Sequence, residues 1–182
     1  EYKWSSVQIN TLTPNERQDL QLKMQQAQEE AKKQKLQRCE EVAKDCQNRF
    51  QTYSEVIKHP YLETKQIKSY TLKLHNKSLV VPIYNVDGEI RSLQFIQEDG
   101  SKRFVSAGQV KGNIFLIGTD FNSINKVQSL VVGEGMATGV SVWDATQIPV
   151  ACVFSANVGQ DAVESIRKKT DARIYLAVDN DK

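Results

Sequence analysis

The chain has 182 residues, with 24 Lys and Arg against 22 Asp and Glu, and it is 40% hydrophobic and 25% charged. This composition is typical of a globular protein of one domain or two small ones, and it excludes a collagen or a chain that is disordered throughout. No apolar run approaches the roughly 18 residues that a membrane helix needs, so we expect a soluble protein that does not enter a membrane.

The start of the sequence and its cysteines indicate the setting. The chain begins with Glu rather than Met and lacks the basic-then-apolar pattern of a secretory signal, so we expect a piece of a longer polypeptide. Cys39, Cys46 and Cys152 form no CxxC motif and no Cys/His cluster with metal-binding spacing, and unpaired thiols are typical of the reducing cytoplasm. We therefore predict a cytoplasmic protein in which any metal ion is held by carboxylates.

Residues 1–57 are predicted to form a helical segment or linker. From Pro14 to Tyr53 the chain has no glycine and no further proline, and it is rich in helix-forming residues, which predicts one long helix or two. Thr13, Pro14 and Glu16 supply a helix start signal. An apolar seam follows at alternating spacings of three and four: Leu36, Cys39, Val42 or Ala43, Cys46, Phe50 and Tyr53. The seam is shorter than a coiled coil needs, which favours packing on the next region over dimerisation.

Residues 58–125 are predicted to form a small β-rich subdomain. The Asp87-Gly88 turn between two apolar runs predicts a β-hairpin over residues 79–96. A second hairpin is expected around residues 98–101, and residues 113–118 are expected to be a further strand of the same antiparallel sheet.

The beginning of this region is basic. Residues 58–77 carry five positive charges against one negative charge: Lys58, Lys65, Lys68, Lys73 and Lys77 against Glu63. A basic patch of this kind can neutralise phosphates. The alternative is a solvated face with no ligand, and charge alone favours this alternative.

Residues 126–182 alternate between strands and helices. Apolar strands are predicted at residues 127–132, 150–154 and 172–178, and helices at 137–145 and 159–169. This alternation predicts right-handed βαβ units and a parallel sheet covered by helices on both faces. The expected fold class is therefore α/β, or α+β overall: a long N-terminal helical segment, a small antiparallel β-rich subdomain, and a parallel sheet that is incomplete at its C-terminal end.

Acidic residues follow two of the predicted parallel strands. Glu134 ends the first strand, and Asp179 and Asp181 follow the third. Sites in open parallel sheets form beyond the carboxyl ends of the strands, where neighbouring strands lie about 4.8 Å apart, so the three carboxylates are expected to meet. A divalent cation would relieve their repulsion, and oxygen ligands without His or Cys point to Mg²⁺, or to Mn²⁺ in its place. The structural alternative is that these residues only form turns and a helix cap.

The sequence around Glu134 resembles a known motif. Glu134-Gly135-Met136-Ala137-Thr138-Gly139 is similar to the EGYATA motif of plasmid- and satellite-phage-type DNA primases, whose catalytic domain has a Toprim fold. Met136 and Gly139 stand where the motif has Tyr and Ala. The upstream stretch resembles the β-rich subdomain that precedes Toprim in these primases, so the similarity covers about residues 58–182. It rests on His59-Pro60-Tyr61-Leu62, Val81-Pro82-Ile83-Tyr84, Gly88, Leu93-Gln94-Phe95-Ile96, Gly100-Ser101-Lys102 and Gly118.

The resemblance implies roles for individual residues. Glu134, Asp179 and Asp181 match the Glu and the DxD pair that bind the catalytic metal in Toprim domains. In primases, basic residues of the β-rich subdomain hold template and nucleotide phosphates; the matching positions here are Lys102, Lys111, Arg91 and Arg103. Asn157, in the loop after the second predicted strand, is placed to line the same site. Because the family's fold continues past the DxD, the Toprim domain is expected to be truncated at Lys182.

The function implied by the resemblance is that of a DNA primase catalytic core. Such a core makes short RNA primers from ribonucleoside triphosphates on a single-stranded DNA template, in plasmid or phage replication or in conjugation. A replicative helicase is a further candidate partner. Two alternatives stay open: a Toprim nuclease or topoisomerase that cleaves phosphodiesters, and a non-catalytic DNA- or partner-binding module of a larger replication protein.

Overall fold

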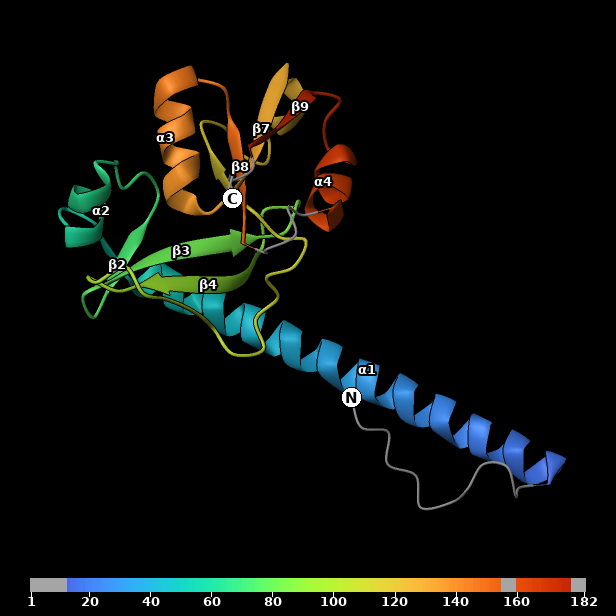
Figure 1. The fold of residues 1–182 in the computed structure, drawn as a ribbon. Helices are drawn as coiled ribbons and strands as arrows, with labels where there is room; N and C mark the ends of the chain where they lie inside the picture. Colours follow the sequence, from blue (N-terminus) through green and yellow to red (C-terminus); the bar gives the residue numbers. More distant parts are fainter. Residues whose placement is uncertain (1–12, 155–159, 178–182) are drawn as a thin grey trace, which may run out of the picture. The chain divides into compact units, whose positions relative to one another are not determined.

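The computed structural model describes residues 13–154 and 160–177, and the chain divides into two units, residues 1–38 and residues 39–182 (Figure 1). Helix α1 (Pro14–Thr52) is one continuous helix and begins as predicted. The Thr13 hydroxyl and backbone N–H donate to the Glu16 carboxylate at 2.7 and 2.8 Å, and these hydrogen bonds lower the pKa of Glu16. Every described residue of the first unit is exposed. Among the described residues, no helix is both long and apolar enough to cross a membrane.

The C-terminal part of α1 packs on the chain's own β-sheet, as the apolar seam predicted. Cys46 and Tyr53 are buried in one cluster with sheet residues Val80, Ile90 and Leu93. Leu36, at the start of the seam, is 57% exposed and lies in the first unit. The buried part of the seam therefore belongs to the second unit, where it covers one face of the first sheet.

The first sheet is antiparallel, with strand order β1-β2-β3-β4-β5. Its strands are β1 (Ser54–Glu55), β2 (Lys73–His75), β3 (Ser78–Tyr84), β4 (Ile90–Ile96) and β5 (Lys102–Phe104). Both predicted hairpins are confirmed, because β4 pairs with β3 and with β5. Asn76 and Lys77 join β2 to β3 with φ of 45° and 63°, the pattern of a two-residue type I′ turn.

The second sheet is mixed, with strand order β6-β8-β7-β9. It contains β6 (Phe115–Ile117), β7 (Ser129–Glu134), β8 (Val150–Val153) and β9 (Arg173–Ala177). The connections include the 3-10 helix η2 (Ile124–Lys126), α3 (Met136–Thr146) and α4 (Gln160–Arg167). Strand β7 runs parallel to both β8 and β9, which confirms the predicted βαβ arrangement and the mixed α/β fold class.

Strand β6 differs from the sequence-based expectation. Its residues were predicted to be a strand of the first sheet, and they do form a strand, but it pairs antiparallel with β8 in the second sheet. Phe115, Leu116 and Ile117 are all buried, so both faces of this strand are covered. A second sheet with helices on both faces provides that environment, whereas the short outer strands of the first sheet, β1 and β5, are exposed.

Two hydrophobic clusters hold the layers together. One joins Leu79, Val81 and Ile96 of the first sheet to the α3 side of the second sheet, and includes Val140 of α3. The other packs Ile166 of α4 on the opposite face of the second sheet. Helices α3 and α4 therefore cover the two faces of the second sheet (Figure 1).

The motif glycine Gly139 is explained by packing. A Cβ atom at this position of α3 would lie 2.2 Å from the sulfur of Cys152 and 3.2 Å from Ile117. Cys152 is fully buried on β8, and its burial raises the pKa of its thiol. The chain has Gly where the primase motif has Ala because the Cys152 sulfur occupies that space.

The effect of Gly139→Ala on the free energy of unfolding should therefore depend on whether residue 152 is Cys. In the natural chain the clash should outweigh the gain of about 0.8–1 kcal/mol in helix propensity, because overpacking a core costs about 1–3 kcal/mol. With Cys152→Ala as the background, the sulfur is absent and Gly139→Ala should be neutral or stabilising. Urea unfolding of the four proteins measures this, and strictly additive effects would contradict the packing account.

Candidate functional site

The parallel strands of the second sheet bring their carboxyl ends to one edge. Glu134 at the end of β7 pairs with Val153 of β8, and Gly133 pairs with Ala177, the last residue of β9. We call this edge, with Glu134, Phe154 and Ala177, the carboxyl rim. In Figure 1, strand β8 runs from the C-terminal end of α3 toward the first sheet.

Three predicted site residues lie outside the described residues: Asp179, Asp181 and Asn157. The two aspartates come two and four positions after Ala177 in the sequence. Their predicted roles stay predictions. The described part of the site that comes from the acidic set is Glu134, which is partly buried.

The backbone after Glu134 leaves room for a ligand. Gly135 has φ of 75°, a left-handed conformation that favours glycine, and its N–H donates to the Val153 carbonyl at 3.0 Å. A Cβ at Gly135 would meet no described atom within 4 Å. Gly135 is also the N-cap of α3, so the first N–H groups of an eleven-residue helix follow Glu134 directly. Such a helix end favours anionic groups.

The outer edge of the first sheet lies beside the carboxyl rim. The Phe104 ring on β5 contacts the Phe154 ring edge-to-face, with centroids 6.2 Å apart. Lys102 and Arg103 precede Phe104 on the same strand, and both are exposed. Lys102 shares the Phe104 face of β5 and so lies beside the strand end of β8, whereas Arg103 pairs with Phe95 and lies on the opposite face, toward the α1 cluster.

The Lys111 side chain contacts the first turn of α4. Its Nζ atom is 2.7 Å from the Asp161 carboxylate, with 82% of the Lys111 side chain exposed. The hydrogen bond that Lys111 donates to the Asp161 carboxylate raises the pKa of Lys111, so the lysine is firmly cationic. A phosphate that binds Lys111 must therefore compete with Asp161.

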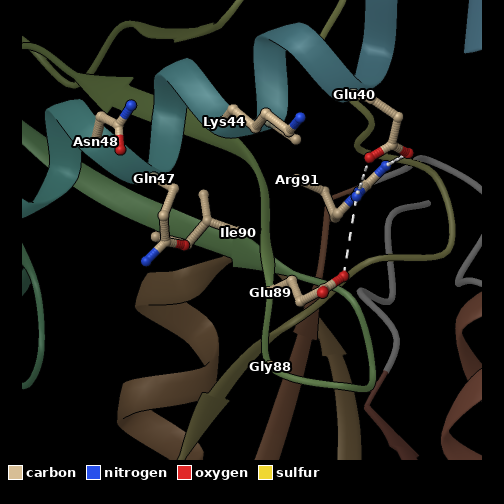
Figure 2. A pocket seen from close by; sticks show the side chains of 9 residues that line it. Glu40, Lys44, Gln47, Asn48, Gly88, Glu89, Ile90 and Arg91 are labelled. Atoms are coloured by element: carbon tan, nitrogen blue, oxygen red, sulfur yellow. Dashed lines mark hydrogen bonds and ion pairs between the residues drawn. The ribbon is translucent and has the colours of Figure 1, made fainter. Parts of the chain in front are cut away.

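Arg91 has a different neighbourhood (Figure 2). Its guanidinium donates to Glu40 of α1, at 3.0 Å for one contact, and to Gln109 at 2.6 and 2.8 Å, and it lies 4.0 Å from Glu89. The Arg91 side chain is 12% exposed and lines a pocket of about 580 Å³ with Lys44. Because Glu40 is on α1, Arg91 extends from the α1 side of the first sheet rather than the side packed on α3. Its phosphate-binding role stays a prediction.

Sequence patterns gave no signal for these partners. Glu40, Asp161 and Phe154 are far along the chain from the residues they contact, and none stands in a motif. Only the pairing of sheets and helices brings them together.

Glu40→Gln should make the free energy of unfolding less dependent on pH in the acid range. The Arg91 hydrogen bond holds the pKa of Glu40 below the ordinary 4.5, so its stabilising effect is present above that value and is lost as the pH falls through the lowered folded pKa. We expect the urea midpoint of Glu40→Gln to lie below that of the natural chain at neutral pH and to converge with it in acid. A constant gap at every pH would contradict this assignment.

Comparison with known proteins supports the resemblance. No protein-family model matches the chain. The chain is 29% identical over 127 residues to DNA primase TraC of Escherichia coli, which covers 68% of this chain and 12% of that relative. The chain thus spans a small part of the relative it matches.

Solved structures of primases share the fold. The catalytic domain of DnaG primase bound to single-stranded DNA has a TM-score of 0.58 and 10% identity, covering 81% of this chain and 63% of that one. The DnaG catalytic core has a TM-score of 0.51 and 10% identity, covering 80% and 62%. The predicted resemblance to DNA primases is confirmed by the sequence relation and by this fold.

Proposed function

We propose that this chain, related in sequence to DNA primase TraC, is a primase catalytic core that joins ribonucleotides into short primers on single-stranded DNA. The observation that carries the proposal is the parallel register of β7 and β9, whose last pair is Gly133 and Ala177, so that Glu134 at the end of β7 comes directly after it. From Ala177 the sequence continues to Asp179 and Asp181, so three carboxylates follow adjacent strand ends. We also propose the organisation that the resemblance implies: a helical segment over 1–57, a β-rich subdomain over 58–125 and a Toprim domain over 126–182.

Glu134, Asp179 and Asp181 would hold Mg²⁺ or Mn²⁺. The donor set fits a hard cation because it consists of carboxylate oxygens. The space into which a Cβ on Gly135 would project is also open, since no described atom lies within 4 Å of it. Within residues 13–154 and 160–177 no group of three His, Cys, Asp or Glu gathers, so the proposed set depends on both aspartates. When bound, the cation would neutralise charge on the triphosphate.

The remaining residues would bind and orient anionic groups. The N–H groups at the start of α3 point a positive helix end toward the rim. Lys102, on the Phe104 face of β5 beside the rim, would hold phosphates of the template or of a nucleotide, and we propose the same role for Arg103 from the opposite face. Lys111 would do so after leaving Asp161. Asn157 is proposed to line the site from the loop after β8.

Glu134→Gln should abolish primer synthesis. The amide keeps the size of the side chain but removes the charge that a cation needs, so we expect a loss of at least about 100-fold in Mg²⁺-dependent synthesis. The measurement is incorporation of labelled ribonucleotides on single-stranded DNA, with the chain in a form extended past Lys182.

Glu164→Gln, an exposed residue on α4, is the matched control and should leave synthesis unchanged. Cutting of the DNA without synthesis would favour the nuclease alternative. DNA binding without synthesis, unaffected by either substitution, would favour a non-catalytic binding module.

Asp161→Asn and Lys111→Gln should act in opposite directions. Asparagine removes the carboxylate that competes for Lys111, so we expect nucleotide binding to tighten by a few-fold, whereas Lys111→Gln should weaken it by a few-fold. Equilibrium binding of a fluorescent ribonucleoside triphosphate measures both. Equal affinities in the two variants would remove Lys111 from the proposed site.

The biological setting is proposed from the same resemblance. We propose service in plasmid or phage replication or in conjugation, in the cytoplasm, with a replicative helicase as partner. These proposals follow from the motif and from the unpaired cysteines.

A further inference from the structure

We infer that Arg91 is a positioning residue of the proposed reaction: it holds residues 105–113 on the first sheet and thereby fixes the place of Lys111. The inference rests on the proposed function, which assigns Lys111 to nucleotide phosphates. We call residues 105–113 the crossing segment, because they lead from β5 of the first sheet toward β6 of the second. Arg91 acts through this segment and needs no contact of its own with substrate.

The crossing segment is irregular and is attached to β4. It contains no strand or helix, and Gly112 has φ of 77°. At its start, the Val105 N–H donates to the Leu93 carbonyl at 3.1 Å. A second backbone hydrogen bond to β4 comes from Gln109, whose N–H donates to the Arg91 carbonyl at 3.1 Å. Gln109 is therefore the point at which the middle of the segment is anchored.

The Arg91 side chain binds the same anchor residue. Its Nε and Nη2 atoms donate to the Gln109 side-chain carbonyl at 2.8 and 2.6 Å. Its Nη1 donates to Glu40 of α1 at 3.0 Å, and Nη2 also contacts that carboxylate (Figure 2). The Arg91 side chain is 12% exposed, so these hydrogen bonds are largely shielded from water and are costly to leave unmade.

These contacts occupy all three guanidinium nitrogens of Arg91. A phosphate that bound Arg91 directly would have to displace the Glu40 carboxylate, the Gln109 amide or both. Glu40, together with Glu89 at 4.0 Å, already supplies the negative charge that balances the guanidinium. The arrangement fits a residue that supports its neighbours better than one that captures a phosphate.

A short turn carries the attachment from Gln109 to Lys111. The Asn113 side-chain amide donates to the Gln109 carbonyl at 3.0 Å, and the Asn113 N–H donates to the Val110 carbonyl at 3.1 Å. Asn113 thus closes a turn that starts at Gln109, and Lys111 lies inside it. The backbone of Lys111 therefore keeps its place only while Gln109 keeps its own.

The crossing segment also packs closely on β4 and on α4. A Cβ on Gly108 would lie 2.2 Å from the Ser92 hydroxyl oxygen, so this position has no room for a side chain. Farther along, a Cβ on Gly112 would lie 3.6 Å from the Asp161 Cβ, so the turn meets the first turn of α4. A movement of the segment on β4 would therefore move Lys111 relative to α4.

The test is nucleotide binding by Gln109→Met in two backgrounds, with the chain extended past Lys182. Methionine keeps the length of the side chain and leaves the charge of Arg91 in place, but it lacks the carbonyl that accepts the Arg91 hydrogen bonds. We expect binding of a fluorescent ribonucleoside triphosphate to weaken by about two- to tenfold, because Lys111 must then be ordered on binding. With Lys111→Gln as the background, Gln109→Met should change the affinity by less than about twofold.

A direct phosphate contact by Arg91 predicts a different sign. Gln109→Met frees part of the guanidinium, so a phosphate that binds Arg91 itself should bind equally well or more tightly. Unchanged or tighter binding would overturn the inference, and so would equal losses in the two backgrounds.

A second variant and a control accompany this test. Arg91→Lys keeps the charge but cannot donate to Glu40 and Gln109 together, so it should weaken binding in the natural background and not in Lys111→Gln. Gln147→Met removes a side-chain amide that donates to the Trp143 carbonyl at 3.0 Å on α3, and it should leave the affinity unchanged. A loss in Gln147→Met as large as that in Gln109→Met would contradict a specific role for the anchor.

Hydrogen exchange tests the attachment without any nucleotide. In Gln109→Met the backbone amides of the crossing segment should exchange faster than in the natural chain, while those of β7 stay unchanged. Unchanged exchange in the crossing segment would show that Arg91 does not hold it, whatever the binding result.

The failure of this inference is distinguishable from that of the proposed function. If the natural chain binds ribonucleoside triphosphate and Lys111→Gln weakens this binding, while Gln109→Met acts equally in both backgrounds, the inference alone is wrong. If the natural chain binds no ribonucleoside triphosphate, the proposed function fails and the inference fails with it.

Discussion

Strand β7 hydrogen-bonds in parallel with β8 on one side and with β9 on the other, and the candidate site depends on this double pairing. Both faces of β7 are buried, with Val131 toward the α3 cluster and Val132 toward the α4 cluster. A shift by one residue would exchange these faces, so burial fixes the register. At the strand end, a Cβ on Gly133 would lie 3.5 Å from the Ala177 Cβ, which shows how closely the two strand ends approach.

The site also requires that the first sheet pack against the second sheet with β5 beside the carboxyl rim. The shared hydrophobic cluster on the α3 side supplies the main contact, and polar contacts orient it. Tyr70 donates to Asp144 of α3 at 2.5 Å, and desolvation followed by this hydrogen bond raises the pKa of Tyr70 to about 12. Lys169 pairs with Asp87 of the β3–β4 turn at 2.6 Å. These contacts keep β5 and Lys102 beside the strand ends.

Local signals predicted the elements well. The Thr13-Pro14 start signal, the Asp87-Gly88 turn and the apolar run before Glu134 each depend on neighbours in the chain, and each was confirmed. The prediction that β6 belongs to the first sheet was wrong, because the sequence of a short apolar strand does not specify which sheet it joins. The reason why the motif has Gly at position 139 became clear only in the structure, where Cys152 lies beside it. The same holds for the Arg91 contacts with Glu40, which α1 packing creates.

The most direct measurement of the central claim is Mn²⁺ binding by electron paramagnetic resonance, which needs no catalytic activity. With a chain extended past Lys182, the account predicts that the natural protein removes the free Mn²⁺ signal and that Glu134→Gln weakens binding by at least about tenfold, because one of three carboxylate ligands is lost. Glu164→Gln should bind as the natural protein does. Equal Mn²⁺ affinity in the natural protein and in Glu134→Gln would contradict a metal site at the ends of β7 and β9.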